Sequence, residues 1–305
     1  MKAGNQAARQ AKAPMARKNK APLEREILER EIKELLARHG FRFSKSMGQN
    51  FLIDADVPER IAEAGRITRD THVFEIGPGI GALTRSLCHR AGFVTAAELD
   101  TKLLPILDET LRGFTNYEIV RGDALKLGLR ELMTRRTEPR IAACSNLPYN
   151  ITAPAVAALL EAEVFETITV MVQRETARRF CAAPGTPDYG AFTVFVNYHA
   201  DAELLFDVPP ESFIPAPKVV SSVVRLTPHA PPEEIRDKEF FFRVVRASFA
   251  QRRKTLVNAL VSGGFGLPKE LLAEYVAACG IDALARGETL GIPEFAELAR
   301  RIAGE

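Results

Sequence analysis

The fold of this chain is decided by the stretch His72-Val73-Phe74-Glu75-Ile76-Gly77-Pro78-Gly79-Ile80-Gly81. An apolar run is followed there by a glycine loop, and the helical pattern Ala82 to Cys88 comes directly after it. A strand, a glycine turn and a helix in this order form the nucleotide-binding unit of open α/β sheets. The glycines are spaced G-x-G-x-G, and the acidic Glu75 before them would repel a pyrophosphate. The loop therefore suits a nucleoside ligand that carries an amino acid instead of phosphates.

Acidic residues stand at the ends of the next two expected strands. Residues 93–98 end in Glu98, which is placed to bind both hydroxyls of a ribose. Residues 117–121 are followed by Gly122 and Asp123, and an Asp there can accept a hydrogen bond from an adenine amine. Each acid alone is commonly a cap or turn residue. Three of them beside a glycine loop favour S-adenosylmethionine (SAM) over NAD as the cofactor.

The tetrapeptide Asn146-Leu147-Pro148-Tyr149, farther along the chain, indicates methyl transfer onto an amino group. An amino nitrogen conjugated to a ring is a poor nucleophile, because its lone pair is delocalised. The Asn146 side-chain oxygen and the Leu147 carbonyl, held out by Pro148, could each accept one of its N–H groups, and Tyr149 could stack on the ring. The alternative is a strand that ends in an ordinary turn, where Asn and Pro are common.

The order of the elements predicts a parallel α/β sheet with its ligand at the carboxyl ends of the strands. Residues 203–208 and 221–226 are expected to add an antiparallel pair, and 191–199 a helix, because a parallel sheet needs a crossover. Strands are expected at 72–76, 93–98, 117–121, 141–145 and 167–173.

Helical patterns follow the proline-rich segment 228–232, which predicts a second, all-helical domain. Basic residues near its start suit a phosphate backbone, although a solvated helix face would look the same. The three phenylalanines 240–242 are expected to be buried. The predicted domains are a disordered basic arm at 1–21, a catalytic domain at 22–228 and an RNA-docking domain at 233–305. The basic residues are Arg243, Arg246, Arg252, Arg253 and Lys254, and the expected helices span 240–249, 252–260, 269–278 and 293–303.

The N-terminal region contains six basic residues and no acid before Glu24, so this arm could contact RNA or be a solvated tail. A short amphipathic helix begins at Pro22 and is closed by Gly40; we expect it to pack near the cofactor cleft as a lid. Its apolar side is predicted to carry Ile27, Ile32, Leu35 and Leu36.

Composition limits the class of protein. The chain has 305 residues, of which 46% are hydrophobic and 26% charged, and no apolar run is long enough to span a membrane. Since it has no signal-peptide pattern, a cytoplasmic protein is expected, without a membrane partner and as a monomer. We assign no metal. Histidines are expected at a helix end (His39), a strand edge (His72) and a helix surface (His89), and Cys88, Cys144, Cys181 and Cys279 are expected to be reduced core thiols.

From Gly48 to Leu226 the chain resembles the ribosomal RNA adenine dimethyltransferases, most closely the bacterial enzymes that act on small-subunit (16S) rRNA. The resemblance implies a Rossmann-like class I SAM-dependent methyltransferase sheet, and that Asn146, Tyr149 and Phe213 hold the target adenine. The matching stretches are 48–52, 75–81, 98–100, 122–124, 146–151, 173–175, 189–190, 213–219, 252–254 and Asn258. The residues assigned to cofactor binding are Gln49, Asn50, Leu52, Glu75, Gly77, Gly79, Gly81, Glu98, Asp123, Ala124 and Asn146, and those assigned to RNA binding are Arg246, Arg252, Arg253 and Lys254.

The function that follows is SAM-dependent N6,N6-dimethylation of adenine in 16S rRNA during ribosome biogenesis. The alternatives are a large-subunit (23S) rRNA dimethylase of the macrolide-resistance type, and a SAM-binding ribosome-assembly factor without catalysis. Phe213 could instead be a core residue that fixes the turn at 215–217. The chain departs from the family pattern at 191–193, which are larger and less polar than usual, and in its long arm before Phe41.

Overall fold

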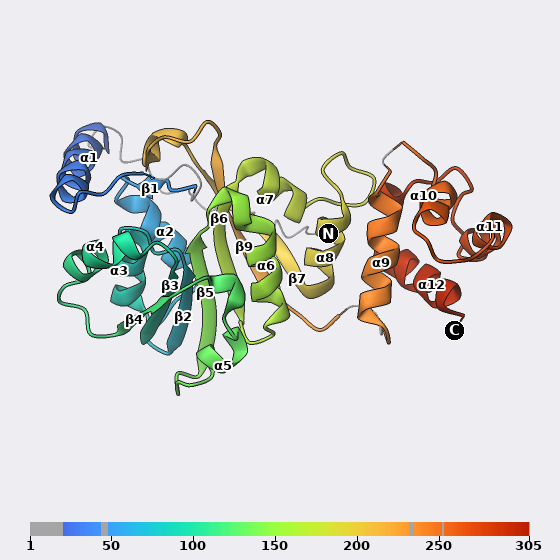
Figure 1. Cartoon of the computed structure of the whole chain (residues 1–305), viewed down its shortest axis with the longest axis horizontal. Helices are drawn as coiled ribbons and strands as arrows, with labels where there is room; N and C mark the ends of the chain where they lie inside the picture. The colour runs from blue at the N-terminus through green and yellow to red at the C-terminus, as the bar shows by residue number, and fades with distance from the viewer. Residues whose placement is uncertain (1–20, 44–47, 232–234, 252, 305) are drawn as a thin grey trace, which may run out of the picture.

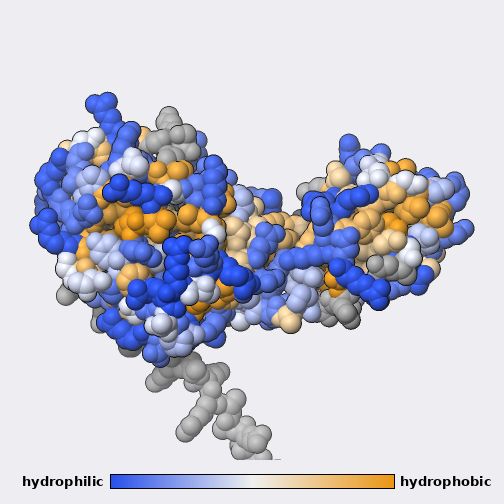
Figure 2. Space-filling view, turned by 60° about the horizontal axis from the view of Figure 1, so that its bottom comes forward, coloured by the Kyte–Doolittle hydropathy of each residue, from blue (hydrophilic) through white to orange (hydrophobic). Residues whose placement is uncertain are grey.

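The computed structural model describes residues 21–43, 48–231, 235–251 and 253–304, and side chains within the first range from Arg25 onward. A large α/β part and a smaller helical part lie side by side along the long axis (Figure 1). In a space-filling view the two form separate lobes joined by a narrower waist (Figure 2). None of the described helices is long and apolar enough to cross a membrane.

A seven-stranded sheet with the order β4-β3-β2-β5-β6-β9-β7 forms the centre of the large lobe. The five expected strands are confirmed, and they run parallel to one another. The expected antiparallel pair is also confirmed, with β9 inserted between β6 and β7 and antiparallel to both. The strands are β2 (Thr71–Ile76), β3 (Phe93–Glu98), β4 (Tyr117–Arg121), β5 (Arg140–Asn146), β6 (Thr167–Gln173), β7 (Ala200–Val208) and β9 (Ser221–Pro228).

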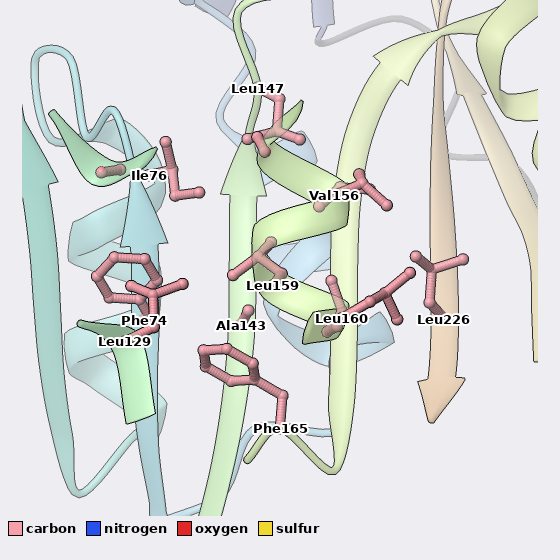
Figure 3. Packing of buried hydrophobic residues seen from close by; sticks show 14 of the residues in the cluster. Phe74, Ile76, Leu129, Ala143, Leu147, Val156, Leu159, Leu160, Phe165 and Leu226 are labelled. Atoms are coloured by element: carbon pink, nitrogen blue, oxygen red, sulfur yellow. The ribbon is translucent and has the colours of Figure 1, made fainter. Parts of the chain in front are cut away.

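Helices cover both faces of this sheet, because successive strand residues point to opposite sides. Val73 packs with α2 (Asp56–Ala64) and α3 (Ala82–Arg90), whereas the next residue, Phe74, packs on the opposite face. Figure 3 shows this second core around Phe74, Ala143 and Leu159, with Leu147 at the carboxyl tip of β5. The helices on that side are α5 (Leu129–Met133), α6 (Thr152–Glu161), α7 (Arg174–Phe180) and α8 (Ala191–His199), while α4 (Leu104–Thr110) follows β3.

The described part of the small lobe has four α-helices, as predicted; Phe241 and Phe242 are buried in it, whereas Phe240 is only partly buried. Its core also takes in Val194 and Tyr198 of α8, an element of the large lobe that was correctly predicted as a helix. At the start of α8, Phe192 contacts the rings of Phe180 and Phe195, so the apolar departure from the family pattern fills space between helices. The four helices are α9 (Lys238–Phe249), α10 (Leu256–Ser262), α11 (Lys269–Ala278) and α12 (Ile292–Ala303).

The predicted N-terminal helix is α1 (Ala21–Arg38). Ile32, Leu35 and Leu36 are buried against Phe51 and Ile80, so α1 packs behind the glycine loop. Ile27 was expected on the same side, but it is 40% exposed. The basic arm at 1–20 lies outside the described residues.

Two further expectations are corrected by burial. Cys88 and Cys144 are core thiols, but Cys181 is exposed, because it ends α7 and begins a surface loop, and Cys279 is only half-buried. His72 does not lie at a strand edge and is buried, because β2 is a central strand. Its ring nitrogens lie 2.8 Å from the Thr95 hydroxyl and 3.1 Å from the Met133 carbonyl.

Candidate functional site

The carboxyl ends of β2, β3, β4 and β5 surround a cavity of about 280 Å³. This is just below the roughly 300–1,000 Å³ typical of small-ligand pockets. Its position agrees with the predicted one, because parallel strands bring their carboxyl ends to one edge of the sheet. The predicted site residues that line it are Gln49, Asn50, Leu52, Glu75, Gly77, Gly79, Glu98, Asp123, Ala124, Asn146, Leu147, Pro148 and Tyr149.

The glycine loop approaches the cavity closely because its backbone is left-handed. Gly77 and Gly79 have φ values of +69° and +60°, which residues other than glycine rarely adopt. A Cβ atom on Gly79 would also lie 3.2 Å from the ring of Phe51. Gly81, at φ +84°, was assigned to cofactor binding but does not line the cavity; a Cβ atom there would lie 3.0 Å from the Thr110 hydroxyl. It allows α3 to begin close to α4.

Glu75 contributes a buried carboxyl group to the floor of the cavity. Its Oε2 atom has no hydrogen-bond partner among the described residues. Burial raises its pKa to about 8; the Thr84 side chain opposes the shift and the negative charge of Glu98 adds to it. An unpaired buried carboxyl calls for a donor or a cation in the cavity, and the ammonium group of an amino-acid ligand is such a group.

Glu98 and Asp123 are held in place by backbone amides. Glu98 Oε1 accepts a hydrogen bond from the Asp100 amide at 2.8 Å, and Oε2 accepts one from the Gly79 amide at 3.3 Å. Burial raises the pKa of Glu98, and these amides oppose the shift. Asp123 Oδ1 accepts from the Leu125 amide at 3.1 Å, while Oδ2 faces Lys126 Nζ at 3.8 Å. Both acids are therefore preorganised acceptors at the rim.

Phe51, Leu99 and Asp100 were not expected in the site, although all three line the cavity. Leu99 is 55% exposed, and a large apolar side chain open at a cavity wall suits the face of a planar ring. Asp100 accepts from Gln49 Nε2 at 2.8 Å and so connects the loop at 48–50 to the end of β3. Its position two residues after Glu98 was the available signal.

Asn146 ends β5 and presents its side chain beside the glycine loop. Its Nδ2 atom donates to the Asn50 carbonyl at 3.4 Å, which leaves Oδ1 without a donor among the described residues. The Leu147 amide donates to the Met171 carbonyl at 3.1 Å, and no described residue donates to the Leu147 carbonyl. The Pro148 carbonyl, in contrast, accepts from the Ile151 amide. Two acceptors, on Asn146 and Leu147, thus remain available, as the motif predicts.

Tyr149 lines the cavity next to these two acceptors, in a single 3₁₀ turn, Tyr149–Ile151. Its hydroxyl lies 2.7 Å from the hydroxyl of Ser221. Burial raises the pKa of the phenol. The phenol is therefore protonated at neutral pH and is not a base.

Phe213, which the resemblance assigns to the target adenine together with Tyr149, does not line the cavity. It belongs to β8 (Phe213–Ile214), which pairs with Leu52 and Phe51 of β1 (Phe51–Leu52). Its ring is 3% exposed and packs with Leu52, Val208 and Val223, and it does not line the cavity. The structure thus places Phe213 in the core beneath β1, in line with the alternative considered above. A stacking role for Phe213 remains a prediction.

The predicted RNA-binding residues lie on the helical lobe, away from the cavity lining. Arg246, near the end of α9, and Arg253 and Lys254, just before α10, are all exposed. Arg252 lies outside the described residues. These cations share one end of the lobe, where α9 connects to α10.

Known proteins are similar to this chain in sequence and in fold. The family model described as ribosomal RNA adenine dimethylase matches residues 40–296. The ribosomal RNA small subunit methyltransferase A of Listeria welshimeri is 46% identical over 277 residues, which cover 88% of this chain and 94% of that protein. The protein of that name from Alkaliphilus oremlandii is 42% identical over 277 residues, or 90% and 96% of the two chains.

Two solved structures are also similar. The 23S rRNA methyltransferase ErmE is 30% identical, with a TM-score of 0.62, over 83% of this chain and 100% of that one. A dimethyladenosine transferase from Plasmodium falciparum is 23% identical, with a TM-score of 0.68, over 83% and 98% of the two chains, and supports the fold. The chain belongs to the ribosomal RNA adenine dimethylase family.

Proposed function

We propose that this protein dimethylates the N6 amino group of adenines in small-subunit (16S) rRNA, with SAM as its cofactor, in the cytoplasm. The observation that carries the proposal is the pair of unpaired acceptors, Asn146 Oδ1 and the Leu147 carbonyl, next to the cofactor loop. An amine with two N–H groups fits two acceptors, and its nitrogen becomes more nucleophilic when both are engaged.

The cavity residues fit SAM at three points. Glu75 has an unpaired buried oxygen for the ammonium group, Glu98 is a fixed acceptor for ribose hydroxyls, and Asp123 is one for the adenine amine. The glycine loop leaves room for the backbone to approach the ligand, since Gly77 and Gly79 carry no side chain. When bound, SAM supplies an electrophilic methyl group.

The protein's own residues then orient the target amine. Asn146 and Leu147 accept its two N–H groups and stabilise the positive charge that develops on the nitrogen. Tyr149 offers a ring face to the extruded base, which has lost its stacking partners in the RNA. No general base is required, because the nitrogen becomes acidic after transfer and its proton can leave to water.

We favour small-subunit rRNA as the substrate, because the relatives named ribosomal RNA small subunit methyltransferase A are 42–46% identical over most of the chain. The solved 23S rRNA methyltransferase, which represents the alternative, is 30% identical. We assign RNA docking to the helical lobe, whose exposed Arg246, Arg253 and Lys254 suit a phosphate backbone.

The test is methylation of purified small and large ribosomal subunits, each incubated separately with labelled SAM, followed by mass spectrometry of the digested rRNA. Dimethyladenosine in 16S rRNA supports the proposal. Product in 23S rRNA alone would support the large-subunit alternative, and SAM binding without any product would support the non-catalytic one. Asn146→Ala should lower the rate by roughly 10²–10³ with little change in RNA affinity, as for the loss of one preorganised polar group. Asn197→Ala, which removes a carboxamide from α8 outside the cavity lining, is the matched control and should keep the wild-type rate.

A further inference from the structure

The hydrogen bond between Tyr149 and Ser221 connects the cavity to a part of the chain that lies outside its lining. Tyr149 lines the cavity, whereas Ser221 is fully buried and does not. Their hydroxyl oxygens are 2.7 Å apart, and the two residues are 72 positions apart in the chain. Ser221 cannot touch a bound base directly, so its effect on one must pass through Tyr149.

Ser221 is a rigid anchor. It is the first residue of β9 and pairs with Gln173 of β6 on one side and Val208 of β7 on the other. The carbonyl of the preceding residue, Val220, accepts a hydrogen bond from the Arg174 amide at 3.0 Å. A hydroxyl carried by a strand that is paired on both sides has a well-defined position, because the backbone beneath it is fixed.

Tyr149 is therefore held at both ends of its side chain. Its backbone belongs to the 3₁₀ turn that follows Pro148, and its phenolic oxygen is bound to β9. A ring fixed only at Cα could rotate and tilt, whereas a ring that is also fixed at its oxygen keeps one plane. Stacking depends on that plane, and so does the distance from the base to the acceptors on Asn146 and Leu147.

We propose that Ser221 is a positioning residue for base methylation: it holds the Tyr149 ring in the plane on which the extruded adenine stacks. This inference rests on the proposed function. The second transfer depends most on this plane. A monomethylated amine has a single N–H left for the two acceptors, so stacking carries more of the orientation.

The experiment is a double-mutant cycle of Ser221→Ala, Tyr149→Phe and the double variant, assayed on small ribosomal subunits. Each single variant should lower kcat about three- to tenfold, the range for losing one neutral hydrogen bond, and should raise the ratio of mono- to dimethyladenosine. The double variant should be no slower than either single one. SAM affinity, measured by calorimetry, should stay within about twofold of wild type, because neither hydroxyl is proposed to contact SAM and the loss of such a contact would weaken binding further.

Ser222→Ala is the matched control. Ser222 is also fully buried, but its hydroxyl donates to Asp207 Oδ1 at 2.5 Å, whereas the Tyr149 hydroxyl is bonded to Ser221. A merely structural role for Ser221 predicts that both serine variants change the melting temperature and neither changes the product ratio. Ser221→Thr, which keeps the hydroxyl, should restore the ratio.

Three results would overturn or redirect the inference. A Ser221→Ala enzyme with wild-type rate and product ratio would refute it. Additive losses, with Tyr149→Phe much slower than Ser221→Ala, would show that the phenol acts on the substrate directly. If the wild-type enzyme yields no dimethyladenosine, the proposed function itself fails. That result differs from a failure of the Ser221 inference, which would appear only in the variants.

Discussion

Gly79→Ala is the substitution whose cost can best be worked from the structure. Gly79 has φ +60°, a left-handed conformation that costs an alanine about 1–2 kcal/mol. Gly40 has nearly the same angle, φ +59°, but a Cβ atom there would meet nothing within 4 Å. Gly40→Ala therefore measures the backbone term alone, and the difference between the two variants isolates what surrounds Gly79.

At Gly79 the new Cβ atom would lie 3.2 Å from the Phe51 ring, which must move by a few tenths of an ångström. Phe51 is 5% exposed and packs against the rings of Phe41 and Phe43, so it cannot move freely. The amide of Gly79 also donates to Glu98, and a shift of the loop weakens that hydrogen bond. Losing one hydrogen bond to a charged group costs about 1.5–3 kcal/mol, or roughly 10–100-fold in affinity.

The assays are thermal unfolding and SAM calorimetry on both variants. Both should melt a few degrees lower than wild type, since about 1 kcal/mol shifts Tm by roughly 2–4 °C in a chain somewhat smaller than this one. Only Gly79→Ala should bind SAM at least about tenfold more weakly. The reasoning is wrong if Gly79→Ala melts like Gly40→Ala and binds SAM with wild-type affinity.

Three further predictions concern pH, the core and RNA docking. The pKa of Glu75 is about 8 in the folded protein against an ordinary 4.5. The folded state thus binds the proton more tightly than the unfolded state does. SAM-free protein should therefore lose stability as pH rises from about 5 to 8, by at most on the order of 5 kcal/mol. In denaturant titrations, Glu75→Gln should flatten this dependence of the unfolding free energy on pH. Phe213→Ala should destabilise the protein by about 3–5 kcal/mol, because it removes a buried ring. If Phe213 acts only in the core, Phe213→Leu should fold and keep the wild-type product ratio; a raised ratio in the leucine variant would support the stacking role instead. The double variant Arg253→Ala with Lys254→Ala should weaken RNA binding without changing SAM affinity. The slope of its RNA affinity against salt should fall by the amount expected for about two phosphate contacts; an unchanged slope would show that these two residues do not contact RNA.

The sequence located most of the cavity because a few physical rules place it. Parallel strands with right-handed crossovers bring their carboxyl ends to one edge, so residues far apart in the chain meet there. Glu75 is the penultimate residue of a strand, and Glu98, Asp123 and Asn146 each end or follow one; all four line the cavity. Gly81 is the exception within its loop, because the helix starts there and faces α4 instead.

Side-chain direction could not be predicted from the motifs alone. Phe213 belongs to a two-residue strand, and its burial is set by pairing with Leu52, a partner far away in the chain. Ser221 is a common residue at the start of a strand, and only the fold brings its hydroxyl to Tyr149. The burial of His72 depends on the position of its strand, β2, within the sheet. The order of strands in a sheet cannot be predicted from the local sequence pattern.

The boundary between the two hydrophobic cores does not coincide with the domain boundary expected from the sequence. The proline-rich segment after Thr227 separates the expected domains, yet Val194 and Tyr198 of α8 belong to the helical core. Within the same helix, Val196 belongs to the α/β core, and Phe195 packs against both. A chain cut after Thr227 would uncover this apolar face, so lost methylation in such a fragment would not distinguish RNA docking from folding. Because α8 contributes to both cores, it connects the helical lobe to the α/β lobe by packing. Substitution of the exposed cations leaves this shared core intact, which is why charge substitutions on the surface test the docking role and truncation does not.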